Sequence, residues 1–140
     1  MAYGQAAETL APVQQIVLLY DGAIRRIKEA RRAIETRQVN ERCVAIAKAA
    51  AIIDGLQAAL DHKRGGEIAA DLDRIYTYLA LRLQSVNLTQ DPLICDELVE
   101  RLSELRASWA ALANGRPPSG PASPRAPTAS RPDVAVRVTI

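Results

Sequence analysis

The sequence has few aromatic residues and no phenylalanine. Aromatic residues make up 4% of its 140 residues, whereas hydrophobic residues as a whole make up 49%. Leucine, isoleucine, valine and alanine must therefore fill the core. Leucine and alanine are strong helix formers, while the aromatic residues that favour strands are scarce. The composition thus favours helices, and the length suits one domain with an appendage.

Cysteine and histidine are also scarce. Cys43 and Cys95 lie far apart in the chain, and His62 is the sole histidine, so a common zinc site could not form without carboxylate help. We expect both thiols to be buried and free, and we expect no metal or other cofactor. The sequence also lacks a long apolar run and a start typical of a secretory signal. We therefore expect a cytoplasmic protein that is not inserted into a membrane.

Net charge is too small to indicate a polyanionic partner. The chain carries +2 overall, and residues 116–140 contribute four arginines against one aspartate. The preceding residues are nearly neutral and have no basic patch with interleaved aromatic residues, which nucleic-acid binding requires. We expect no nucleic-acid partner.

Apolar residues recur every three or four positions in four successive segments, which is the spacing of amphipathic helices. The first predicts a helix over roughly 12–36 that begins at Pro12, and the second a helix over about 41–62 with Asn40 as N-cap. Gly65 and Gly66 follow the second segment and predict a break. The inward positions are Val13, Ile16, Tyr20, Ala23, Ile27, Ala30 and Ile34, then Ile46, Ala49, Ile53, Leu56 and Leu60.

The third and fourth segments continue the pattern. Asp91 and Pro92 predict the N-cap and first residue of the last helix, and Asn114 with Gly115 predicts its end. The inward positions are Ile68, Leu72, Ile75, Leu79 and Val86, widened by Tyr76 and Leu83, then Cys95, Leu98, Leu102, Leu105, Trp109 and Leu112.

Four helices with short connections predict an all-α fold, an antiparallel up-down four-helix bundle over residues 12–115. Residues 1–11 precede the bundle as a separate N-terminal segment. Residues 116–140 are rich in proline, alanine and serine, and this composition predicts a disordered tail.

Apolar residues outside these stripes indicate where a partner could bind. Small side chains on the outer side of the second helix would let a partner helix approach closely, and large apolar side chains on the third cost solubility unless they are covered. Alanine is also simply a good helix former, and self-association would produce the same surplus as a foreign helix. The predicted groove residues are Ala47, Ala51, Ile52, Ala58, Tyr78 and Leu81.

No set of residues indicates catalysis. His62 with Lys63 and Arg64 could belong to a helical bundle that relays phosphoryl groups. However, a phosphorelay histidine needs a continuing helix to hold its ring, and Gly65 follows three residues later. We expect a protein that is not an enzyme, with a phosphotransfer domain as one alternative and a helical dimerisation or scaffold module as another.

Four segments resemble the FliS family of flagellin-export chaperones. They are residues 15–24 (QIVLLYDGAI), 49–56 (AAAIIDGL), 65–79 (GGEIAADLDRIYTYL) and 105–109 (LRASW), within a resemblance that covers about residues 2–112. The resemblance implies an antiparallel bundle that binds the disordered C-terminal region of flagellin in the cytoplasm. Such a protein prevents premature polymerisation and delivers flagellin for type III export, with the flagellar export apparatus as a further partner.

The resemblance also implies an N-terminal segment that lies over the bundle and gives way when flagellin binds. The family carries a tyrosine there, matched by Tyr3, and a Thr-x-x-Pro pattern, matched by Thr9 to Pro12. We assign Tyr3 and Leu10 to this lid. The groove residues, by contrast, rest on helix periodicity alone, and we expect a monomer or a weak homodimer.

Overall fold

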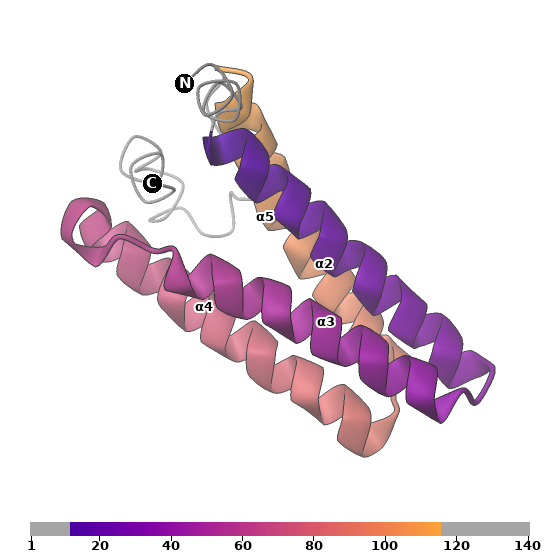
Figure 1. Cartoon of the computed structure of the whole chain (residues 1–140). Helices are drawn as coiled ribbons and strands as arrows, with labels where there is room; N and C mark the ends of the chain where they lie inside the picture. The colour runs from indigo at the N-terminus through magenta and orange to yellow at the C-terminus, as the bar shows by residue number, and fades with distance from the viewer. Residues whose placement is uncertain (1–11, 116–140) are drawn as a thin grey trace, which may run out of the picture.

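A computed structural model of the chain describes residues 12–115, which form four helices. Consecutive helices run in opposite directions, so the described part is an antiparallel up-down bundle (Figure 1). The predicted all-α fold is confirmed, while the predicted lid and tail lie outside the described residues. The helices are α2 (Pro12–Glu35), α3 (Val39–Ala58), α4 (His62–Thr89) and α5 (Pro92–Ala113).

The helices are arranged as two pairs, α2 with α5 and α3 with α4 (Figure 1). The pairs meet near the α2–α3 connection and diverge toward the end where α2 begins and α5 ends. Among neighbouring helices, contacts are most extensive where α2 packs on α3 and on α5, and least extensive between α4 and α5. α2 is therefore the central element of the packing.

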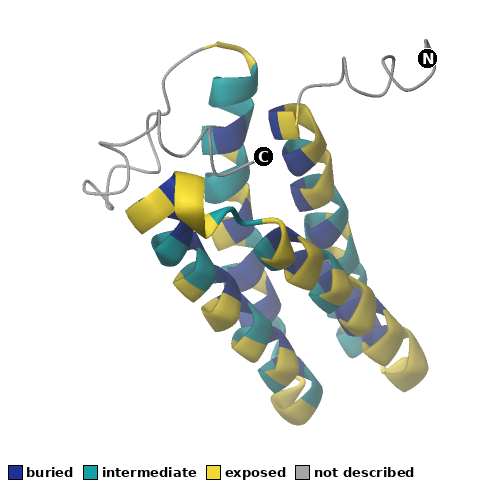
Figure 2. Cartoon of the chain, turned by 60° about the vertical axis from the view of Figure 1, so that its left-hand side comes forward, coloured by how far each residue is buried: buried dark blue, intermediate teal, exposed yellow. Residues whose placement is uncertain are grey.

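Buried side chains from all four helices form one core (Figure 2). Most of the predicted inward positions are buried, but some lie half-buried at its edge. In α2, Ala33 is buried and Ile34 is half-buried, because a straight helix drifts by about 20° per heptad and the inward side moves along the sequence. The half-buried predicted positions are Ile34, Leu60, Ile75, Leu105 and Leu112.

The prediction that Asn40 caps the second helix is wrong. The N–H of Gln38 donates to the Ala33 carbonyl at 2.8 Å and the N–H of Arg37 donates to the Ile34 carbonyl at 3.2 Å. Arg37 has φ 61, so the end of α2 is a Schellman motif with arginine where glycine is usual. This tight turn lets α3 begin at Val39, directly after Gln38, which makes no side-chain capping bond.

The second helix was predicted to end at about residue 62, but α3 ends at Ala58. The Asp61 carboxylate accepts a hydrogen bond from the Arg64 N–H at 3.0 Å and thereby starts α4 at His62. At the next connection the prediction is confirmed, because Asp91 accepts from the Leu93 N–H at 2.9 Å and Pro92 is the first residue of α5.

The paired glycines break α4 from within. Gly66 has φ 53 and ψ −126, a conformation that side-chain-bearing residues rarely adopt. Residues 62–65 therefore form a first helical turn, and the helix resumes after a kink at Gly66. The predicted break is present, but it does not require a separate loop.

Candidate partner-binding surface

A buried hydrogen-bonded cluster fixes the framework of the bundle. The hydroxyls of Tyr20 and Tyr76 share a hydrogen bond of 2.7 Å, and Nε1 of Trp109 donates to the Tyr20 hydroxyl at 3.3 Å. Burial raises the pKa of Tyr76 to about 12 and also raises the pKa of Tyr20, so both phenols stay neutral. This tyrosine–tryptophan cluster joins α2, α4 and α5, and its polar groups satisfy one another.

The α2–α3 contact is close because α2 carries a glycine there. A Cβ added to Gly22 would lie 3.3 Å from Cδ1 of Ile52. Ile52 is half-buried and packs against the core from this position. The side chain of Ile52 therefore faces α2, which defines the register in which the two helices lie.

Large apolar side chains remain exposed next to this contact. Leu18 and Leu19 lie one turn before Gly22 and are 58% and 41% exposed. Gly55 lies about one turn beyond Ile52 on the antiparallel neighbour, which puts it level with these leucines. A Cβ at Gly55 would meet nothing within 4 Å among the described residues. We call Leu18, Leu19, Gly22, Ala51, Ile52 and Gly55 the α2–α3 face.

The predicted groove residues of the second helix lie on the outside of the bundle. Ala47, Ala51 and Ala58 are all exposed and share the outward side of α3. Ile52 lies at the border of this side, toward α2. Leu18 and Leu19 were not predicted as part of this surface, because the inward stripe and the family motif of residues 15–24 do not indicate which outward residues stay exposed.

Tyr78 and Leu81 are exposed too, at 41% and 66%, but Tyr78 lies on a different side of the bundle from the α3 residues. The Tyr78 hydroxyl donates to the Glu97 carboxylate of α5 at 2.6 Å, and the guanidinium of Arg101 lies 5.6 Å from the centre of its ring. Tyr78 therefore belongs to the α4–α5 contact.

The outer edge of the contact between α3 and α4 is polar. The amide of Gln57 donates to the Asp73 carboxylate at 2.6 Å and to the Thr77 hydroxyl at 2.9 Å. Next to the α2–α3 connection, the buried Arg42 donates to the side-chain oxygen of Asn87 at 3.2 Å. The structure thus brings the four predicted α3 residues together but separates them from Tyr78.

Glu97 is the centre of a polar cluster between α4 and α5. Its carboxylate accepts hydrogen bonds from Tyr78, from Arg82 at 2.8 Å and from Arg101 at 3.3 Å. The hydrogen bonds from Tyr78 and then Arg82 lower the pKa of Glu97 to about 2. We call Tyr78, Arg82, Glu97 and Arg101 the Glu97 cluster. On the outer side of α4, Leu81 and Leu88 form a second exposed apolar stripe.

Among residues 12–115, no group of His, Cys, Asp or Glu side chains could hold a metal ion. His62 is exposed at the first position of α4, before the kink at Gly66. Cys95 is buried, and burial raises its pKa to about 11. The expectation that Cys43 is buried is wrong, because its neighbours Arg42 and Ala45 occupy the inward side of α3.

None of the four described helices has the length and apolar character of a membrane-spanning segment.

Comparison with known proteins finds the same family that the sequence motifs resemble. The sequence pattern described as "Flagellar protein FliS" matches residues 2–116. A relative from Pseudomonas aeruginosa, "Flagellar secretion chaperone FliSB", is 42% identical over 98 residues, which are 70% of this chain and 78% of the relative.

Two further relatives are both named "Flagellar secretion chaperone FliS". The protein of Salmonella typhimurium is 38% identical over 105 residues, covering 74% of this chain and 78% of its own length. The protein of Vibrio cholerae is 27% identical over 99 residues, covering 71% and 73%. The family match includes the α2–α3 face and the tyrosine–tryptophan cluster. This chain therefore belongs to the FliS family of flagellar proteins.

Proposed function

We propose that this protein is a flagellar export chaperone that binds the C-terminal region of flagellin in the cytoplasm and holds it for type III export. Family membership supports the chaperone role, because its relatives are named flagellar secretion chaperones. The observation that carries the proposal is the α2–α3 face, where Leu18 and Leu19 stay exposed beside an already complete core. The choice of flagellin as cargo follows from the family resemblance.

The cargo surface includes the α3 residues Ala47, Ala51, Ile52 and Ala58 together with the leucines of α2. Small residues on α3 support close approach of a cargo helix, since nothing in the described part of the chain occupies the space above Gly55. Tyr78 and Leu81 form a second contact on α4. A disordered cargo chain can reach both contacts because it folds along the surface as it binds.

The proposed action is competition for apolar surface. Fully covering a leucine side chain is worth about 1.5–3 kcal/mol, and ordering a disordered cargo offsets several kcal/mol of the total. Binding is thus specific yet reversible. While the apolar helical stripes of a flagellin subunit are bound to this surface, they cannot pack against other flagellin subunits, so the subunit cannot polymerise. This action requires no catalytic residue.

Tyr3 and Leu10 are proposed to cover part of the same surface until cargo arrives. They lie outside the described residues, so their role rests on the family resemblance. A chain truncated before Pro12 should bind cargo more tightly than the full chain, since no lid has to be displaced. Equal affinity of the two would remove the lid from the proposal.

Calorimetric titration with a soluble peptide from the C-terminal region of the same organism's flagellin tests the function. We expect a one-to-one complex with a negative heat-capacity change, because apolar surface is buried. Size-exclusion chromatography with mass measurement of each partner alone should return a monomer or a weak homodimer. No binding together with a stable homodimer would show that the exposed apolar surfaces serve self-association.

Two matched substitutions locate the cargo. Leu19→Asp places a charge on the α2–α3 face and Leu81→Asp places one on the second contact, and each should weaken cargo binding about tenfold or more without unfolding the bundle. Leu93→Asp is the control, because Leu93 is exposed in the first turn of α5 and belongs to neither proposed contact. A variant with unchanged affinity removes its own contact from the site.

Gly55→Ala separates the stability of the bundle from its binding. The substitution should stabilise the free bundle by about 0.5–1 kcal/mol, because glycine in a helix interior is unfavourable and the new methyl group meets nothing. The same methyl group should weaken cargo binding if a cargo helix approaches there. Higher thermal stability with unchanged affinity would show that the cargo does not pack on Gly55.

A further inference from the structure

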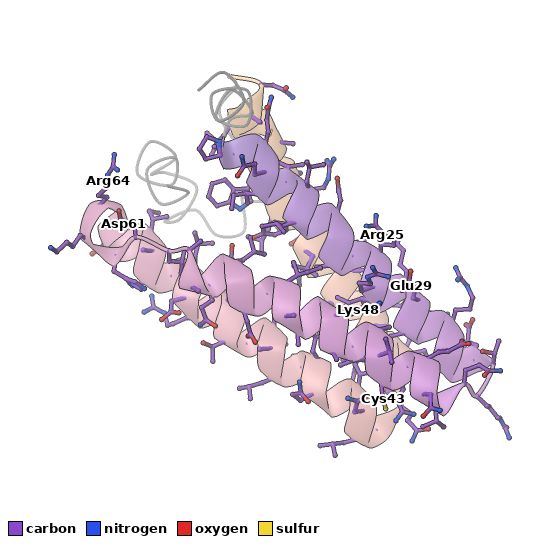
Figure 3. All side chains as sticks on the ribbon, viewed as in Figure 1. Arg25, Glu29, Cys43, Lys48, Asp61 and Arg64 are labelled. Carbon is purple, nitrogen blue, oxygen red and sulfur yellow. The ribbon has the colours of Figure 1, made fainter. Side chains whose placement is uncertain are left out.

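The α2–α3 face continues toward the α2–α3 connection as a cationic surface. The contact of Gly22 with Ile52 sets the register of the two antiparallel helices. One turn further along α2 and one turn back along α3, this register places Arg25 level with Lys48. Both side chains are exposed, and Figure 3 shows them with Glu29 on the same side of the α2–α3 pair.

Arg25 lies directly at the border between the apolar and the cationic parts. A terminal nitrogen of its guanidinium, Nη2, lies 3.9 Å from the position that a Cβ on Gly22 would take. The same position is 3.3 Å from Ile52. A ligand that covers Ile52 would therefore also reach the guanidinium of Arg25.

The positive charge at this place is not neutralised within residues 12–115. Glu29 is the acidic residue beside it, and its carboxylate is already bonded to Arg26 at 3.1 Å. Neither Arg25 nor Lys48 forms an ion pair with another described residue, and Arg32, two turns further along α2, is likewise exposed. Six other arginines of the described residues do have carboxylate partners, namely Arg26, Arg31, Arg74, Arg82, Arg101 and Arg106.

We propose that Arg25 and Lys48 bind acidic side chains of the cargo segment that covers the α2–α3 face. This inference rests on the proposed function and specifies its ligand: a helical segment with an apolar stripe, followed about one to two turns later by aspartate or glutamate. The apolar contacts lie toward the start of α2 and the cations lie toward its end. Both can be satisfied only when the cargo helix runs in one direction.

Exposed charges act mainly on orientation and association rate. Complementary charges steer the encounter and penalise the wrong register, whereas the apolar contacts supply most of the affinity. Salt should therefore weaken cargo binding through the cationic part, since interactions of exposed charges are screened within about 8 Å at physiological ionic strength.

The test compares two charge reversals of equal size in the full chain. Arg25→Glu/Lys48→Glu removes the proposed contact, and Lys63→Glu/Arg64→Glu changes the charge equally at the exposed first turn of α4, away from the α2–α3 face. The probe is the flagellin C-terminal peptide, labelled with a fluorophore and titrated at low and at high salt. Thermal melts followed by circular dichroism check that each variant is folded. If the charge reversal destabilises α2, the neutral variant Arg25→Gln/Lys48→Gln replaces it in the titration.

We expect the reversal at Arg25 and Lys48 to weaken binding about tenfold or more at low salt and to abolish most of the salt dependence. The control reversal should change neither, and a peptide with its acidic residues replaced by lysine should bind the reversed variant better than the wild type. If the wild type binds the peptide, and the two reversals weaken binding equally or not at all, this inference alone is overturned. A wild type that does not bind the peptide at all overturns the proposed function.

Discussion

Two of the polar clusters that join the helices of this bundle differ in their surroundings. The tyrosine–tryptophan cluster is enclosed by the core, with Tyr20 and Tyr76 at most 1% exposed. The Glu97 cluster lies at the surface, where the Glu97 side chain is 28% exposed. Both clusters bridge α4 and α5, but only the first also includes α2, through Tyr20.

The difference shows how polar contacts contribute to this fold. A buried hydroxyl that loses its partner cannot turn to water, so the buried cluster penalises any arrangement in which α2, α4 and α5 are out of register. A surface ion pair loses little when it opens, because water replaces the partner. We therefore infer that the buried cluster specifies the packing and that the Glu97 cluster supports the less extensive α4–α5 contact.

The largest expected contrast comes from removing one tyrosine from each cluster. Tyr20→Ala should destabilise the bundle by about 3–5 kcal/mol, since it leaves a large cavity and deprives both Tyr76 and Trp109 of their partner. Tyr78→Ala should lose only a fraction of that stability, because Tyr78 is exposed. Urea unfolding followed by far-ultraviolet circular dichroism measures both, and losses of similar size would contradict the comparison.

Removing only a hydroxyl tests the hydrogen bonds without a cavity. Tyr76→Phe should cost about 1–3 kcal/mol, because the Tyr20 hydroxyl then keeps only its bond from Trp109. Tyr78→Phe removes the hydroxyl that bonds to Glu97 and should have a smaller effect. If Tyr76→Phe were neutral, the buried cluster would contribute packing and not hydrogen-bond specificity.

The two clusters should also respond to opposite ends of the pH scale. The pKa of Tyr76 is raised to about 12 in the folded state, so the stability that depends on its neutral form is present below pH 10 and is lost as pH rises through about 12. Stability should fall over this range in the wild type and fall less in Tyr20→Phe/Tyr76→Phe. Equal slopes for the two proteins would show that these phenols are not the groups that titrate.

Acid should weaken the Glu97 cluster, with the smallest of these effects. The pKa of Glu97 is lowered to about 2, so its contribution is present above its unfolded pKa of 4.5 and is lost as pH falls through about 2. Glu97→Gln should be less stable than the wild type by about 1 kcal/mol or less near neutral pH, after allowance for solvent screening. The difference should shrink toward pH 2, and a constant difference would mean that the charge of Glu97 is not what stabilises the contact.

The periodicity of the sequence predicted the helices and most of the core correctly. Val13, Tyr20 and Ile53 were placed inward by spacing alone, and each is buried. The boundaries were less predictable where local chemistry is unusual. Arg37 takes the left-handed position that glycine normally occupies. Asp61 caps the next helix by accepting a hydrogen bond from the Arg64 N–H, within the range where the sequence predicted that the second helix ends.

The candidate surface was only partly predictable. The outward direction of Ala47, Ala51 and Ala58 follows from the period of a single helix, although their role in binding stays a prediction. Which neighbour lies beside an outward residue depends on how the helices pack. Spacing within α4 could not show that Tyr78 turns toward Glu97 of α5, nor that Leu19 remains exposed where α2 and α3 meet.

The sequence by itself determined the number of helices, their inward sides and the family to which the chain belongs, because these depend on local spacing and on contiguous motifs. Only the tertiary structure decided that Tyr20, Tyr76 and Trp109 share one buried cluster and that Arg25 lies level with Lys48. The physical reason is that such contacts join residues distant in the chain. Their register is set by close packing between helices, as where Gly22 admits Ile52, and no periodicity within one helix specifies it.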